Sequence, residues 1–206
     1  MKLDKDVKTM LKEGGILFAI TLAAGLLLGF VYELTKEPIR LQEGKKIREA
    51  CLEVFPGAAA FSEIDYVPGE EARAQLEADG VELGTVYEAF GADGASVLGY
   101  VLETISKEGY GGELTLYMGV TKDGFLNGIS ILEISETPAL GMRAEEVLVP
   151  QFREKKAAFF TYTKTGSKSD SEIDAISGAT VTTKAVTDAV NGGLKAAAEL
   201  TGGEGS

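Results

Sequence analysis

The stretch that organises this chain runs from Asp174 to Val190 and reads Asp-Ala-Ile-Ser-Gly-Ala-Thr-Val-Thr-Thr-Lys-Ala-Val-Thr-Asp-Ala-Val. Its second half predicts a helix, because apolar residues recur there at helical spacing, namely Val181, Ala185, Val186, Ala189, Val190 and, just beyond, Leu194. The small, hydroxyl-bearing first half suits a phosphate group, since free N–H groups and the helix dipole converge at a helix start. The same Ser and Thr residues also suit an ordinary helix cap. Taken alone, the stretch favours the cap and leaves the phosphate site as the alternative.

Composition excludes several kinds of chemistry. The chain has 206 residues, of which 45% are hydrophobic, so it can bury a substantial core. It contains no histidine, which excludes Ser-His-Asp and Cys-His catalysis and imidazole metal sites. Cys51 is the only cysteine and cannot by itself form an internal disulfide, a zinc site or an iron–sulfur site. We therefore expect no catalytic side chain and no metal, and any redox chemistry requires a bound cofactor.

Charge is unevenly distributed along the chain. The net charge is −12, yet basic residues outnumber acidic ones in the first 48 residues, and acidic residues dominate the remainder. An acidic body repels phosphates, so we expect no nucleic-acid partner. A basic amino-terminal end on such a body suggests an anchor.

The anchor is predicted by an apolar run, Ile16–Tyr32, which contains seventeen residues without a charge. That length approaches the ~20 residues needed to cross a bilayer. A cleaved signal peptide and a buried core helix are the alternatives, but the run is long for a signal peptide and lacks a polar face. We expect a transmembrane helix at 14–34 and, because four lysines precede it (Lys2, Lys5, Lys8 and Lys12), a cytoplasmic tail at 1–13. The following body then lies outside the cell (inner or cytoplasmic) membrane.

The remainder predicts an α+β fold. Helical patterns at Lys36–Val54 and Glu70–Ala78 mark a helical connector region at 35–80. Strand-rich segments separated by glycine-containing turns follow at Val81–Phe90, Ser96–Ile105, Glu113–Thr121 and Phe125–Ile134. Such short spacing favours an antiparallel sheet or half-barrel with flanking helices. A helical piece at Arg143–Gln151 and a strand at Ala157–Thr163 precede the terminal helix. We expect this domain to span 81–201, with a flexible tail at 202–206.

Three short signatures stand in a fixed order behind the anchor. They read Gly109-Tyr-Gly-Gly-Glu-Leu114, Ser135-Glu-Thr-Pro-Ala-Leu-Gly141 and Asp174-Ala-Ile-Ser-Gly-Ala-Thr-Val-Thr182. Together they resemble the FMN-binding domain family, and within it the G subunits of Rnf-type ion-translocating ferredoxin:NAD oxidoreductases. One departure is visible: the middle signature of the family usually reads Glu-Thr-Pro-Gly-Leu-Gly, and Ala139 replaces its first glycine.

The resemblance implies that FMN is joined by a phosphoester to the hydroxyl of Thr180, with Ser177, Gly178 and Ala179 beside it. Threonine is a poor nucleophile without a nearby base, so a separate flavin transferase is implied, with Asp174 as part of what that enzyme recognises. The candidates for lining the flavin are Gly112, Glu113, Thr137, Leu140 and Gly141. Lys164 or Lys184 is a possible basic neighbour of the phosphate or of reduced flavin.

The implied function is electron relay through covalent FMN within a membrane complex that contains other membrane, iron–sulfur and flavin subunits and is surrounded by lipid. A C subunit of a sodium-translocating NADH:quinone reductase is one alternative, because it carries the same flavin motif. An anchored flavoprotein that feeds an extracellular reductase is another. The third is a non-redox anchored binding module, which predicts no covalent cofactor.

Overall fold

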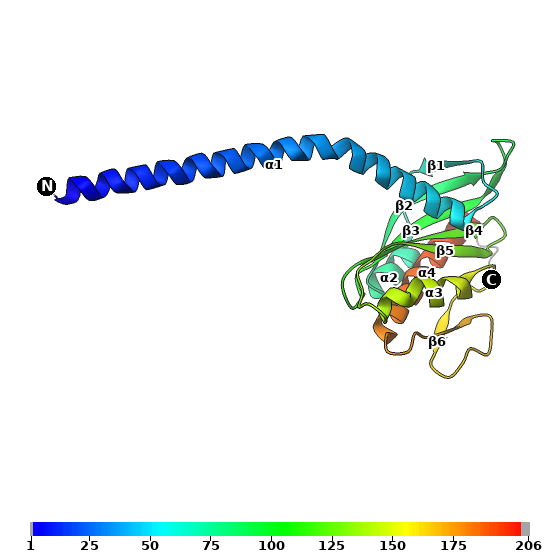
Figure 1. Ribbon diagram of the computed structural model, residues 1–206. Coiled ribbons are helices and arrows are strands. Elements are labelled where there is room, and N and C mark those ends of the chain that lie inside the picture. Colours follow the sequence, from blue (N-terminus) through cyan, green and yellow to red (C-terminus); the bar gives the residue numbers. More distant parts are fainter. Residues whose placement is uncertain (1, 203–206) are drawn as a thin grey trace. The chain divides into compact units, whose positions relative to one another are not determined.

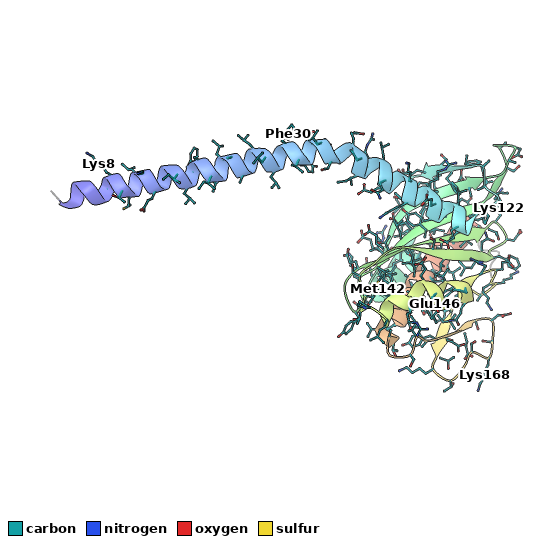
Figure 2. All side chains as sticks on the ribbon, in the orientation of Figure 1. Lys8, Phe30, Lys122, Met142, Glu146 and Lys168 are labelled. Atoms are coloured by element: carbon teal, nitrogen blue, oxygen red, sulfur yellow. The ribbon has the colours of Figure 1, made fainter. Side chains whose placement is uncertain are left out.

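The computed structural model describes residues 2–202, and the chain divides into two compact units, Met1–Lys45 and Lys46–Ser206. In the first unit the chain is a single helix, part of α1 (Lys2–Val54). It is the one helix among the described residues that is long and apolar enough to cross a membrane, with a mean hydropathy of 2.3 in its most apolar window. Its apolar side chains are exposed, and Figure 2 shows Phe30 and Lys8 projecting from it. The expected membrane anchor therefore corresponds to a continuous helix.

The second unit is built on a five-stranded antiparallel sheet in the order β1-β2-β3-β4-β5 (Figure 1). Its strands are β1 (Ala60–Ile64), β2 (Val81–Phe90), β3 (Val97–Ser106), β4 (Leu114–Thr121) and β5 (Leu126–Ile134). Each strand pairs antiparallel with the next in sequence. The antiparallel sheet with flanking helices confirms the expected α+β fold. Strand β1 was not expected, and it lies inside the segment interpreted as a helical connector.

One face of the sheet packs against α4 (Thr180–Leu200) and α2 (Glu70–Ala78) and carries the larger core. Side chains alternate between faces along a strand, so Leu102 of β3 and Leu116 and Met118 of β4 lie in this core. Gly193 gives α4 its close approach, because a Cβ there would overlap the sulfur of Met118. The terminal helix is therefore fixed across the middle of the sheet.

The other face packs against the end of α1, in a second core that contains Cys51, Val54, Val101 and Tyr117. Phe55 fits against Gly99 and Gly119, where added Cβ atoms would lie 2.8 and 2.9 Å from its ring. Burial in this core raises the pKa of the Cys51 thiol to about 11. Cys51 is thus a buried apolar residue with an unreactive thiol, and the sheet is covered on both faces.

Between β5 and α4 the chain forms short elements: η1 (Gly141–Arg143), α3 (Ala144–Val147), η2 (Val149–Phe152), and the parallel strands β6 (Thr161–Thr163) and β7 (Glu172–Asp174). The expected strand at Ala157–Thr163 is thus limited to its last three residues. Asn191 of α4 replaces the missing ladder bonds there, since its Oδ1 accepts from Phe160 N at 2.7 Å and its Nδ2 donates to Phe160 O at 2.9 Å. This segment carries the chain from the sheet to the start of α4.

Candidate functional site

A cavity of about 460 Å³ lies where the three sequence signatures meet. Its lining comes from the loop before β4, the loop after β5 and the start of α4: Tyr110, Glu136, Thr137, Leu140, Gly141, Gly178, Ala179, Thr180, Val181 and Thr182. Met142 and Glu146, labelled in Figure 2, mark the η1–α3 segment that directly follows the second of these loops. Segments about 70 residues apart in sequence therefore form one site.

The start of α4 is open to a ligand. Ala179 occupies the N-cap position, and no side chain caps the helix. The first helical hydrogen bond runs from Thr183 N to Ala179 O at 3.0 Å, so the N–H groups of Thr180, Val181 and Thr182 precede it. Serine or threonine capping, the favoured interpretation of this stretch in isolation, is therefore wrong. The N–H groups at the start of α4 remain available to a phosphate or another anion.

Local bonds hold the turn before α4 in shape. The Thr183 hydroxyl donates to Ala179 O at 2.9 Å and accepts from Ile176 N at 3.1 Å. Gly178 has a φ of +81°, which favours glycine, and a Cβ there would lie 3.1 Å from Leu140. The Thr182 side chain is also buried, yet its hydroxyl has no hydrogen-bond partner among the described residues and lines the cavity. A ligand in the cavity can supply that partner.

The two glycine-rich loops pack directly against each other. A Cβ on Gly111 would overlap the carbonyl oxygen of Ser135 in the other loop, whereas one on Gly109 would overlap the carbonyl oxygen of Gly112 within the same loop. Tyr110 N donates to Glu136 Oε1 at 2.9 Å, which adds a polar link between the loops. Glycine in the first signature therefore serves the close approach of two backbones.

The second loop is a tight turn around Thr137. Its carbonyl oxygen accepts from Leu140 N at 3.2 Å and from Met142 N at 3.3 Å. Ala139 has a φ of +63° at the centre of this turn, a conformation that glycine adopts more easily. The departure at Ala139 therefore leaves the backbone in the shape that a glycine would take, and it introduces strain.

The structure brings most of the expected residues to the cavity. Gly178, Ala179, Thr180, Thr137, Leu140 and Gly141 line it, whereas Gly112, Glu113 and Ser177 do not. Gly112 instead has a φ of +140° in the first loop, and Glu113 is exposed. Four lining residues were not anticipated: Tyr110, Glu136, Val181 and Thr182. Val181 had been assigned to the buried face of the helix, but it is 48% exposed because it lies in the first turn beside the cavity.

Asp174 has a local structural role in the loop at 164–172. Its carboxylate accepts from Ser167 N at 2.6 Å and from the Ser167 hydroxyl at 3.4 Å, and its own N–H donates to Gln151 Oε1 at 2.6 Å. Neither lysine considered as a basic neighbour lines the cavity. Lys184 pairs with Asp188 at 2.5 Å, and this hydrogen bond raises the pKa of Lys184. None of the described residues that line the cavity is basic, so the positive character of its lining comes from backbone N–H groups of α4.

Comparison with known proteins agrees with this site. Residues 109–195 match the model of the FMN-binding domain, and residues 1–54 match that of the RnfG N-terminal region. The first match covers all three signatures, so this chain carries an FMN-binding domain in the segment that forms the cavity.

Similar proteins extend over nearly the whole chain. The G subunit of the Na⁺-translocating ferredoxin:NAD⁺ oxidoreductase complex of Acetobacterium woodii is 34% identical, with 92% of each chain covered. The G subunit of the proton-translocating ferredoxin:NAD⁺ oxidoreductase complex of Clostridium ljungdahlii is 31% identical, over 94% of this chain and 98% of that protein. This chain belongs to the family of G subunits of ion-translocating oxidoreductase complexes. A crystal structure of Shewanella oneidensis NqrC is also similar, at 22% identity and a TM-score of 0.47, over 57% of this chain and 58% of that chain.

Proposed function

We propose that this chain relays electrons through an FMN held covalently on Thr180, as the anchored G subunit of an ion-translocating ferredoxin:NAD⁺ oxidoreductase. The observation that carries the proposal is the cavity in which the three signatures meet, with Thr180 in its wall at the uncapped start of α4. The relatives named above are G subunits of such complexes, which supports this role over that of a quinone-reductase C subunit.

The residues around the cavity suit FMN. Its volume of about 460 Å³ falls within the range of small-molecule sites. The free N–H groups of Val181 and Thr182 are suitable donors to a phosphate, and the unpartnered Thr182 hydroxyl is another. Leu140 and Val181, which are 40% and 48% exposed, offer apolar surface to an aromatic ring. A polar end and an apolar rim in one cavity match the two ends of this cofactor.

When bound, FMN supplies reversible uptake and release of electrons. In the proposed relay, electrons come from an iron–sulfur or flavin centre of one neighbouring protein of the complex and pass to another such centre, so this chain returns to its starting state. The chain's own residues would bind and orient the cofactor: the start of α4 would hold the phosphate, the loops around Tyr110 and Thr137 would contact the ring, and Leu140 would limit access of water. No side chain of this chain needs to act as acid, base or nucleophile in such a relay.

Attachment requires a separate flavin transferase in this proposal, because a threonine hydroxyl is a poor nucleophile. We propose that Asp174, six residues before Thr180, belongs to the segment that the transferase recognises. The proposed topology places residues 1–13 in the cytoplasm, 14–34 in the cell membrane and the second unit outside, with the flavin in the domain at 81–201.

Attachment is tested by producing the full-length protein with a flavin transferase, denaturing it, and looking for flavin fluorescence in the protein band. The wild-type band fluoresces and the Thr180→Val band does not. Thr182→Val is the matched control: it removes the neighbouring hydroxyl in the same cavity, and its band remains fluorescent. A dark wild-type band would sink the electron-relay proposal, whereas a dark Thr182→Val band beside a fluorescent Thr180→Val band would move the attachment to Thr182.

A further inference from the structure

Glu136 is the one charged residue among the described residues that line the cavity. Its Oε1 accepts the hydrogen bond from Tyr110 N at 2.9 Å, and its Oε2 has no hydrogen-bond partner in the described part of the chain. The side chain is only half-buried and lines the space available to a ligand. None of the ion pairs within residues 2–202 involves it.

Glu136 also lies close to the start of α4. A Cβ placed on Gly141 would be 2.7 Å from the Cβ of Glu136, 2.8 Å from its Oε2 and 2.7 Å from the Thr182 hydroxyl oxygen. Gly141 therefore lets the carboxylate and the first turn of α4 share one end of the cavity. No basic side chain is among the described residues that line the cavity, so positive character in the lining comes from the N–H groups at the start of α4.

We infer that Glu136 sets the reduction potential of the flavin: it joins the two loops through Tyr110, and its charge makes reduction less favourable. This inference rests on the proposed function. Reduction adds negative charge to the flavin, and a like charge in the wall of the same cavity disfavours the more negative state. The cavity lining holds no cation among the described residues to cancel that effect.

The two roles of Glu136 are separable by substitution. In Glu136→Gln the amide oxygen still accepts from Tyr110 N, but the charge is lost. In Glu136→Ala both are lost. Glu133→Gln is the control for charge: Glu133 lies near the end of β5, is exposed and does not line the cavity, and its replacement changes the net charge equally.

The experiment is a redox titration of the full-length, flavin-loaded protein, followed by flavin absorbance. Glu136→Gln increases the equilibrium constant for flavin reduction on the order of tenfold. For a two-electron couple, this corresponds to a midpoint potential that is ~30 mV higher. Glu133→Gln leaves the potential at the wild-type value, because solvent screens an exposed charge. Glu136→Ala, measured by gel fluorescence and thermal unfolding, shows less flavin and a lower midpoint temperature than Glu136→Gln.

Three outcomes overturn the inference. The first is a loaded Glu136→Gln protein whose potential equals that of wild type or of Glu133→Gln. The second is a Glu136→Gln protein without flavin, which would assign the carboxylate to attachment or folding. The third is a Glu136→Ala protein with unchanged flavin loading and thermal stability, which would show that the hydrogen bond from Tyr110 to Glu136 does not hold the two loops together. Failure of the proposed function is seen separately, as a dark wild-type band in the denaturing gel, and would remove this inference with it.

Discussion

Ala139 has a backbone conformation that alanine rarely adopts, with a φ of +63° in the turn around Thr137. A left-handed conformation costs an L-residue about 1–2 kcal/mol, and glycine avoids this cost. Glycine also has more freedom in the unfolded chain, which offsets part of the gain.

We predict that Ala139→Gly raises the free energy of unfolding by up to about 1 kcal/mol. Chemical denaturation of the full-length protein in detergent measures the change. Ala198→Gly is the matched control, because it makes the same substitution inside α4 and costs about 1 kcal/mol. A loss of stability in Ala139→Gly would show that the turn does not strain the alanine.

Among individual residues, the sequence predicted some of those that line the cavity and missed others for a physical reason. Thr180 and Gly178 belong to a continuous motif at a helix start, and the resemblance carried by that motif identifies them. Tyr110 and Glu136 reach the cavity because Gly111 allows one loop to contact the backbone of the other at Ser135. That contact joins segments 24 residues apart, and no local pattern reports it.

Helix α4 connects the cavity to the core, and Asn191 makes a buried polar contact outside the helix. Both polar atoms of the Asn191 side chain bond the backbone of Phe160 in a buried position, at 2.7 and 2.9 Å. The Phe160 N–H and C=O groups have no ladder partner, because β6 begins only at Thr161.

We predict that Asn191→Ala lowers the free energy of unfolding by about 2–4 kcal/mol, since it leaves two buried backbone groups unpaired. Lys195→Ala on the same helix is the control: it removes an exposed ion pair with Glu71 and changes stability by less than about 1 kcal/mol. Urea denaturation followed by circular dichroism measures both. Equal effects of the two substitutions would contradict the role given to Asn191.

Elements with a strong internal pattern were predicted well, and short ones were not. Strands β2 to β5 differ from their predicted bounds by at most one residue, because their alternation and glycine-containing turns define them locally. Strand β1 has five residues and mostly exposed side chains, and its main support is the pairing with β2. Such a strand is determined by its neighbour rather than by its own sequence.

At the scale of the whole molecule, the proposed topology gives a prediction for labelling. In a Cys51→Ala background, a cysteine at Ser169 lies in the exposed loop between β6 and β7, and one at Lys12 lies before the apolar run. We predict that a membrane-impermeant maleimide labels Ser169→Cys in intact spheroplasts and labels Lys12→Cys only after permeabilisation. Labelling of Lys12→Cys alone in intact spheroplasts would reverse the proposed orientation.

The covered second face of the sheet has a consequence for protein production. The end of α1 supplies Cys51 and Val54 to that face, and Phe55 follows directly, so part of the long amino-terminal helix also belongs to the folded body. A soluble version that begins at residue 46 keeps this cover. One that begins at residue 81 leaves Val101 and Tyr117 bare and the edge of β2 unpaired, and such surfaces promote aggregation. The cut that separates anchor from body therefore has to fall within a helix.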